Sequence, residues 1–316
     1  MNKEQIVMFK YLPLIVTFIM ISFVGYIVVT KKSEYIFMEA QKTNTIGAFV
    51  KQKTCARPPQ FLTNLKIPQP VMIDLSQKRF KGIALLHGKN LEKVFHPKQW
   101  EQYGYMGTYT LDEKGNIYVA PMPYISIYPT TFNLQKNIYK VDSKTGKLSI
   151  VMHLDDVFPS ASNPYGVNTL TYDCDDKTLW VAAIDESDYS SQKGVIYHID
   201  LETKEILQKI EGFDVLSMTL LQSDKGKFLL VGSARDNGLY AYRITENKLE
   251  DKAVKLLELP HANEHIRKIK ITAKNQLELQ SIPFSYTLIA RSAKEDRLVY
   301  KANWNSHQSS WILSTR

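Results

Sequence analysis

The chain has 316 residues, 44% apolar and 11% aromatic, so it can bury a substantial core. Its formal charge is +8, but residues 1–60 alone carry eight Lys or Arg against three Glu. The rest of the chain is therefore close to neutral, with both signs mixed, which gives little support to a nucleic-acid role. We expect no nucleic-acid partner.

One strongly apolar stretch lies near the N-terminus. Residues 11–29 hold no charged side chain, follow Lys10 and precede Lys31 and Lys32. These 19 residues come close to the roughly 20 that cross a bilayer as a helix, and exceed the apolar core of about 7–15 residues in a cleaved signal peptide. We expect an uncleaved transmembrane anchor, with a removed signal peptide as the alternative.

This anchor divides the chain into four parts: a tail at 1–10, the anchor at 11–29, a stalk or linker at 30–60 and a folded domain at 61–316. Lysines flank both ends of the anchor, so the positive-inside bias does not decide its orientation. A short tail before a single anchor usually stays in the cytoplasm. We therefore expect a single-pass membrane protein whose folded domain is extracytoplasmic.

The two cysteines bear on the same question. Cys55 lies near the end of the stalk, and Cys174 lies in a turn of the folded domain. An even number of cysteines in an exported domain permits one disulfide that pins the stalk to the domain. The alternative is two unrelated thiols, and the sequence leaves both open.

A pair of short apolar segments recurs through the folded domain. The first member occurs at 117–120, 179–182 and 228–232, and the second at 138–142, 196–200 and 239–242. The segments are β-branched or aromatic and are bounded by turn residues, which is typical of strands. Repetition every 45–60 residues or so, with about four strands per unit, indicates a β-propeller. We expect an all-β propeller of five four-stranded blades, or six if two units are merged here, with a β-sandwich as the alternative.

The expected strands fall into one partial and four complete units. The partial unit has strands at 71–75, 80–87 and 91–95, and we expect the other terminus to supply its missing strand and close the ring. The complete units have strands at 107–112, 117–121, 137–142 and 147–153; at 167–173, 178–184, 194–200 and 205–210; at 215–222, 227–233, 238–244 and 254–259; and at 266–272, 276–282, 297–302 and 310–314.

The connections between strands differ in length on the two faces of this propeller. One face, the short-turn face, carries turns such as 112–116 and 143–146, whose Asp, Asn and Gly are explained by turn chemistry. The other, the long-loop face, is where binding residues are expected to gather, although any single aromatic residue there can instead pack its loop onto the sheet. The binding candidates are Trp100, Tyr105, Tyr124, Tyr165, Asn168, Asp185, Asp188, Arg235, His261 and His265.

The segments 165–172, 177–182 and 194–200, together with 107–119, share their strand pattern with a known family. They resemble the gluconolactonase and luciferin-regenerating-enzyme propellers, of the calcium-dependent phosphotriesterase type, and more distantly NHL repeats. The resemblance implies a channel calcium that activates a lactone or ester, with Asn168 as one ligand. The next inner strand has no carboxylate in register, and Asp214 is nearby but out of register. Calcium takes about six to eight oxygen ligands, so one Asn does not complete the site.

Other patterns for metal binding or catalysis are incomplete. His261, Glu264 and His265 come nearest to a cluster, and no zinc-ligand spacing, nucleophile elbow or phosphate loop occurs. The acidic run at 173–176 predicts a hairpin turn rather than a metal site. The run at 185–188 is a solvated acidic loop or a peripheral calcium site, and we favour the loop.

Together these features predict a membrane-anchored, extracytoplasmic propeller that acts as a binding or scaffold module through its long-loop face. Its ligand would be a protein, a peptide or a glycan. The alternative is a calcium-dependent lactonase or esterase. The two differ in whether at least three carboxylate or amide side chains converge on the channel, and the sequence places only Asn168 there.

Overall fold

The computed structural model describes residues 46–50, 55–75, 80–124, 132–273, 275–287 and 297–314. The predicted tail, the anchor at 11–29 and part of the stalk lie outside these ranges. Within them, no helix is long and apolar enough to span a bilayer. The described helical elements are short: α2 (Gln60–Asn64) and two 3-10 helices, η1 (Lys98–Tyr103) and η2 (Phe132–Lys136).

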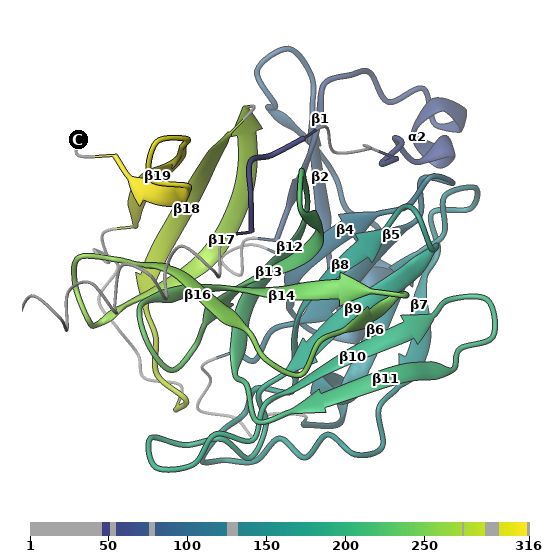
Figure 1. The fold of residues 1–316 in the computed structure, drawn as a ribbon. Coiled ribbons are helices and arrows are strands. Elements are labelled where there is room, and N and C mark those ends of the chain that lie inside the picture. Colours follow the sequence, from purple (N-terminus) through teal and green to yellow (C-terminus); the bar gives the residue numbers. More distant parts are fainter. Residues whose placement is uncertain are drawn as a thin grey trace, which may run out of the picture.

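Five antiparallel sheets follow one another in the sequence (Figure 1). The first strand of each sheet lines one common central channel. The prediction of an all-β propeller with five blades is confirmed, although the blades have three to five strands. The first three blades consist of β1 (Val71–Asp74), β2 (Ala84–His87) and β3 (Lys93–Phe95); β4 (Met106–Leu111), β5 (Ile117–Pro121), β6 (Asn137–Val141) and β7 (Leu148–His153); and β8 (Val167–Asp173), β9 (Thr178–Ala183), β10 (Val195–Asp200) and β11 (Ile206–Glu211).

The last two blades have the same order of strands. They consist of β12 (Val215–Ser223), β13 (Gly226–Ser233), β14 (Gly238–Thr245), β15 (Lys248–Leu249) and β16 (Val254–Glu258); and of β17 (Glu264–Ala273), β18 (Gln276–Pro283), β19 (Leu298–Asn305) and β20 (Ser310–Leu313). In the fourth blade β15 is an added short strand, which pairs with β14 as β16 does.

The core lies between the blades. Each of four apolar clusters joins two consecutive blades, so that the strands in the middle of a sheet are covered on both faces. Every residue of β5 and of β9 is buried. A strand buried on both faces needs a nearly continuous apolar sequence instead of an alternating one. This explains the short apolar segments that recur in the sequence.

The first blade differs from the expectation. Among the described residues no C-terminal strand completes it, and β20 pairs with β19 inside the fifth blade. Instead, α2 and η1 pack beside β3: the ring of Phe95 lies 5.9 Å from that of Phe61 and 5.8 Å from that of Trp100. Helical elements cover this part of the blade, which is another way to protect a sheet edge.

Part of the predicted stalk packs on the short-turn face. Phe49 forms a β-bridge with Ser223, and its amide donates to Oδ1 of Asn275 at 2.8 Å. Ile46 is buried in the cluster between the fourth and fifth blades. Figure 1 shows this segment in purple beside β12 and β17. Ile46 and Phe49 therefore contribute to the apolar core between the fourth and fifth blades.

The chain then continues across the same face toward the second blade. Cys55 forms a disulfide with Cys174 at the β8–β9 turn, with a Cα–Cα distance of 5.9 Å. The Arg57 amide donates to the Asp112 carbonyl at 3.3 Å, and the Phe61 amide to the Ser143 carbonyl at 2.7 Å. The segment before α2 thus contacts short turns of both the second and the third blade.

The acidic run 173–176 forms the hairpin turn between β8 and β9, as predicted. Lys227 of the fourth blade lies against it, with Nζ at 2.5 Å from Asp173, 3.3 Å from Asp175 and 3.1 Å from Asp176. Burial lowers the pKa of Lys227, but the hydrogen bonds and charges of Asp173 and Asp176 outweigh it, so the pKa is raised. The turn therefore ties two blades together.

Buried His198 should make stability depend on pH. Its ring stacks on Trp180 at 3.8 Å and its Nε2 lies 2.8 Å from the Thr178 hydroxyl, and burial lowers its pKa below 6.5 despite the nearby Asp173 and Asp176. Because the unfolded chain takes up the proton first, the free energy of unfolding should fall as pH drops below that value, by up to about 1.4 kcal/mol per pH unit until the folded pKa is reached.

Urea unfolding between pH 7.5 and 5 measures this slope. We expect His198→Gln to flatten it, whereas His307→Gln, at an exposed position, should leave it unchanged. Equal slopes for the wild type and His198→Gln would contradict the assignment.

Candidate functional site

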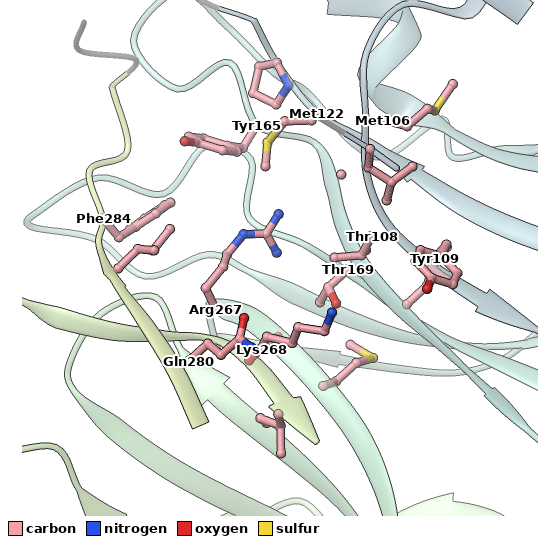
Figure 2. Close-up of a pocket in the computed structure, with 18 of the residues that line it drawn as sticks. Met106, Thr108, Tyr109, Met122, Tyr165, Thr169, Arg267, Lys268, Gln280 and Phe284 are labelled. Atoms are coloured by element: carbon pink, nitrogen blue, oxygen red, sulfur yellow. The ribbon is translucent and has the colours of Figure 1, made fainter. Parts of the chain in front are cut away.

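The central channel has a cavity volume of about 1080 Å³. The first strand of each blade lines the channel, and residues of the long loops after β5 and β18 line its end at the long-loop face. Figure 2 shows side chains from these strands pointing into one common space. The channel therefore reaches the long-loop face.

A β-bulge interrupts the inner strand of each of the last four blades, close to its long-loop end. The extra residues are Asn168 in β8, Leu216 in β12 and Arg267 in β17, and the bulge in β4 lies between Met106 and Tyr109. A bulge re-aims side chains, and bulges are over-represented beside functional sites. These four positions form a layer around the channel, which we call the bulge layer.

Hydrogen bonds join the blades within the bulge layer. Thr108 donates to the Asn168 carbonyl at 3.3 Å, and Asn168 Nδ2 donates to the Val215 carbonyl at 2.7 Å. The Ser217 hydroxyl donates to the Ile266 carbonyl at 2.6 Å. Each bond connects one blade to the next, so the bulge layer holds the inner strands at a fixed spacing around the channel.

Positive charge predominates in the channel. Of the described residues that line it, Arg267, Lys268 and Arg297 are cationic and Asp74 is the single carboxylate. Arg267 and Lys268 both extend into the cavity in Figure 2, although successive side chains of a regular strand alternate between faces. The bulge accounts for this. Burial, Lys270 and Arg267 lower the pKa of Lys268.

Aromatic side chains surround the long-loop end of the channel. The ring of Phe284 lies 5.3 Å from those of both Tyr165 and Tyr286, and Tyr105 stacks on Tyr124 at 4.1 Å. Tyr124, Tyr165 and Phe284 line the cavity itself, and Tyr124 is 39% exposed. We call Tyr124, Tyr165 and Phe284 the aromatic rim.

Of the predicted binding candidates, the structure thus brings Tyr124 and Tyr165 to the channel, with Tyr105 beside them. Three others hold loops in place. The Asp185 carboxylate, whose pKa is raised by burial, accepts from the Phe158 amide at 2.7 Å. Asp188 accepts hydrogen bonds from Ser190 and Ser191 within its own turn, which lower its pKa. Arg235 donates to the carbonyls of Asp188 and Tyr189.

The remaining candidates lie elsewhere. Trp100 is completely buried in the core beside the first blade, and its Nε1 donates to the Gly146 carbonyl at 3.1 Å, which leaves no surface for a partner. His265 is buried and packs edge-on against Phe284 at 5.9 Å, whereas His261 is exposed. The large apolar surface of Trp100 explains its position, because burial of an indole with one satisfied donor is strongly favourable.

Asn168 is the calcium ligand that the resemblance to the lactonase-like propellers implies. Asn168 Oδ1 is buried without a hydrogen-bond partner among them, so it has a free oxygen. However, no group of three or more His, Cys, Asp or Glu side chains in the described part of the chain is placed to hold a metal ion. Both oxygens of Asp214 already accept hydrogen bonds, and Glu264 accepts from Ser281 and Tyr300.

Sequence reasoning missed the cationic residues of the channel. Arg267 and Lys268 occur in a strand whose other residues alternate ordinarily, and no motif marks them. The available signal was the repeat itself: the position that Asn168 holds in the third blade is held by Leu216 in the fourth and Arg267 in the fifth.

No protein-family model and no curated protein sequence matches the chain. Similar solved structures include the Kuenenia stuttgartiensis hydrazine synthase, at 11% identity and a TM-score of 0.43, over 74% of this chain and 59% of that one. A second is a protein of unknown function from Bacteroides caccae, at 13% identity and a TM-score of 0.41, over 76% of this chain and 85% of that one. A third is a glucose dehydrogenase, at 13% identity and a TM-score of 0.42, over 77% of this chain and 78% of that one.

Similarity at this level carries no argument about function, and the predicted membership of the gluconolactonase-like family stays a prediction. The class of protein rests on the chain's own sheets and channel. It is a five-bladed β-propeller with a cationic central channel and an aromatic rim.

Proposed function

We propose that this protein is a membrane-anchored, extracytoplasmic binding module that receives its ligand in the central channel from the long-loop face. The observation that carries the proposal is the open channel with its aromatic rim. Binding sites for small ligands are typically concave, roughly 300–1,000 Å³ in volume, and lined by aromatic side chains with a few polar groups. A glycan, or the end of a peptide or protein chain, fits that size.

Two features support the anchor and the side of the membrane. The apolar stretch 11–29 is long enough to span a bilayer. The disulfide between Cys55 and Cys174 favours an oxidising compartment, because disulfides are rare in the cytosol. Both agree with a folded domain outside the cytoplasm.

Arrays of immobilised glycans and peptides, probed with the full chain in detergent micelles, test the binding function. We expect saturable binding to at least one probe and at least a tenfold loss of affinity in Phe284→Ala, since truncation of a central aromatic contact commonly costs about 2 kcal/mol. Phe158→Ala is the matched control, because Phe158 is exposed on the same face but does not line the channel. Binding that Phe284→Ala leaves intact would contradict the proposal.

The alternative, a calcium-dependent lactonase or esterase, rests on the free oxygen of Asn168. The same preparation decides it when its unfolding temperature is compared in EDTA and in millimolar calcium. A ligand that binds only the folded state raises that temperature. An increase of several degrees would favour the enzyme, and the same temperature in both would favour the binding module.

A further inference from the structure

We propose that the channel binds a small organic anion, whose carboxylate or phosphate group contacts Arg267 and whose ring lies against the aromatic rim. This inference rests on the proposed function, since it specifies the ligand of the same channel. Its starting point is the bulge in β17, which turns Arg267 and Lys268 toward one cavity (Figure 2).

Arg267 has donors to spare. Its Nη1 lies 3.4 Å from the Leu216 carbonyl oxygen, a long hydrogen bond that uses one of the five N–H groups of a guanidinium. The groups that act on its charge are Tyr165 and Arg297, and no carboxylate of the described chain forms an ion pair with it. A half-buried guanidinium with no carboxylate beside it favours an anionic ligand, because the attraction is screened less than at a fully exposed site.

The planar guanidinium fork matches the two oxygens of a carboxylate or phosphate group. Lys268 adds a second positive charge beside it in Figure 2, and Thr169 brings a hydroxyl group to the same region. A hydroxyl group can donate to an anion without adding negative charge to the site. The site therefore combines positive charge with a neutral donor, and both favour an oxyanion.

The surroundings of the guanidinium also indicate what the rest of the ligand is. Tyr165, Phe284 and Met122 lie on the long-loop side of Arg267 in Figure 2. These side chains offer apolar and aromatic surface, on which a sugar or another ring can stack. Simple inorganic phosphate would fill little of a cavity of about 1080 Å³. We therefore infer an anion that carries a ring.

A purely structural role for Arg267 makes a different prediction. If its only purpose were to hold the Leu216 carbonyl, the channel would not distinguish an anionic ligand from its neutral counterpart. Charge selectivity is therefore the property to measure.

Isothermal titration of the full chain in detergent micelles with four probes provides that measurement: glucose, glucuronate, glucose 6-phosphate and inorganic phosphate. We expect at least one of the two sugar anions to bind ten times more tightly than glucose, and more tightly than inorganic phosphate. Its affinity should fall as sodium chloride is raised, because salt screens the charges.

Arg267→Gln should abolish the tenfold preference for the anion, and Arg267→Lys should retain part of it. Arg243→Gln, at an exposed position outside the channel, is the control. Far-UV circular dichroism and unfolding temperature verify that each variant is folded. Equal affinity for glucose and both sugar anions, or a preference that survives in Arg267→Gln, overturns the inference.

The two proposals fail in different ways. If Phe284→Ala weakens glycan or peptide binding but Arg267→Gln leaves charge selectivity unchanged, the binding function stands and the anion site does not. If no probe of either experiment binds, both proposals fall.

Discussion

Replacing both Cys55 and Cys174 with serine is expected to lower the free energy of unfolding by about 4–5 kcal/mol, the chain-entropy estimate for a disulfide that closes a loop of this length. The two residues are 119 apart in the sequence, so the bond restricts more than a third of the unfolded chain. The Cys55→Ser/Cys174→Ser variant retains the packing of Ile46 and Phe61, and it should still fold.

Urea unfolding of the wild type and of this variant, each with and without dithiothreitol, measures the effect. Reductant should lower the urea midpoint of the wild type to that of the variant, and it should leave the midpoint of the variant unchanged. A wild-type midpoint that is insensitive to reductant would contradict the expectation. In intact cells, maleimide labelling should find both thiols blocked, and free thiols there would count against the extracytoplasmic placement.

Asp214→Ala is expected to lower the free energy of unfolding by about 3–5 kcal/mol, because it leaves buried hydrogen-bond donors without an acceptor. Asp214 is completely buried in the link between the third and fourth blades. Its carboxylate accepts from the Ser187 hydroxyl at 2.6 Å, the Gly194 amide at 2.7 Å and the Tyr286 hydroxyl at 2.6 Å. It thus joins loops of the third and fifth blades beside the aromatic rim.

Chemical denaturation of three variants separates these contributions. Tyr286→Phe removes one donor and should lower the free energy of unfolding by about 1–2 kcal/mol. Asp155→Ala removes an exposed carboxylate, and its free energy of unfolding should stay within about 0.5 kcal/mol of the wild-type value. Because Tyr286 packs on Phe284, Asp214→Ala should also weaken any ligand that binds at the rim. An Asp214→Ala loss no larger than that of Tyr286→Phe would show that the carboxylate does not act as the hub.

The strands could be predicted from the sequence because their signals are local. The apolar run at 179–182 and the turn residues around 173–176 specify a strand and a hairpin without reference to the rest of the chain. The strand expected at 167–173 is β8 with the same bounds. The contrast between short turns and long loops followed from the same signals.

The site depends on relations between strands, which local patterns do not contain. The direction of Arg267 follows from the register of β17 against β18, where one added residue re-aims two side chains. The sequence places Asp214 only near the position of a calcium ligand, out of register. Its three hydrogen-bond donors come from segments that are distant in the sequence, so no local pattern reveals its role. Trp100 resembled a surface aromatic because nothing local shows that η1 buries it.

The route of residues 46–62 across the short-turn face has a consequence for how the molecule stands on a membrane. A chain anchored through 11–29 would reach the domain at this face, after at most about 55 Å of extended polypeptide from residues 30–45. The disulfide fastens that approach to the third blade. The short-turn face would then lie toward the lipid headgroups, and the long-loop end of the channel would open to the aqueous solution. Its ligands would arrive from solution, not from within the bilayer.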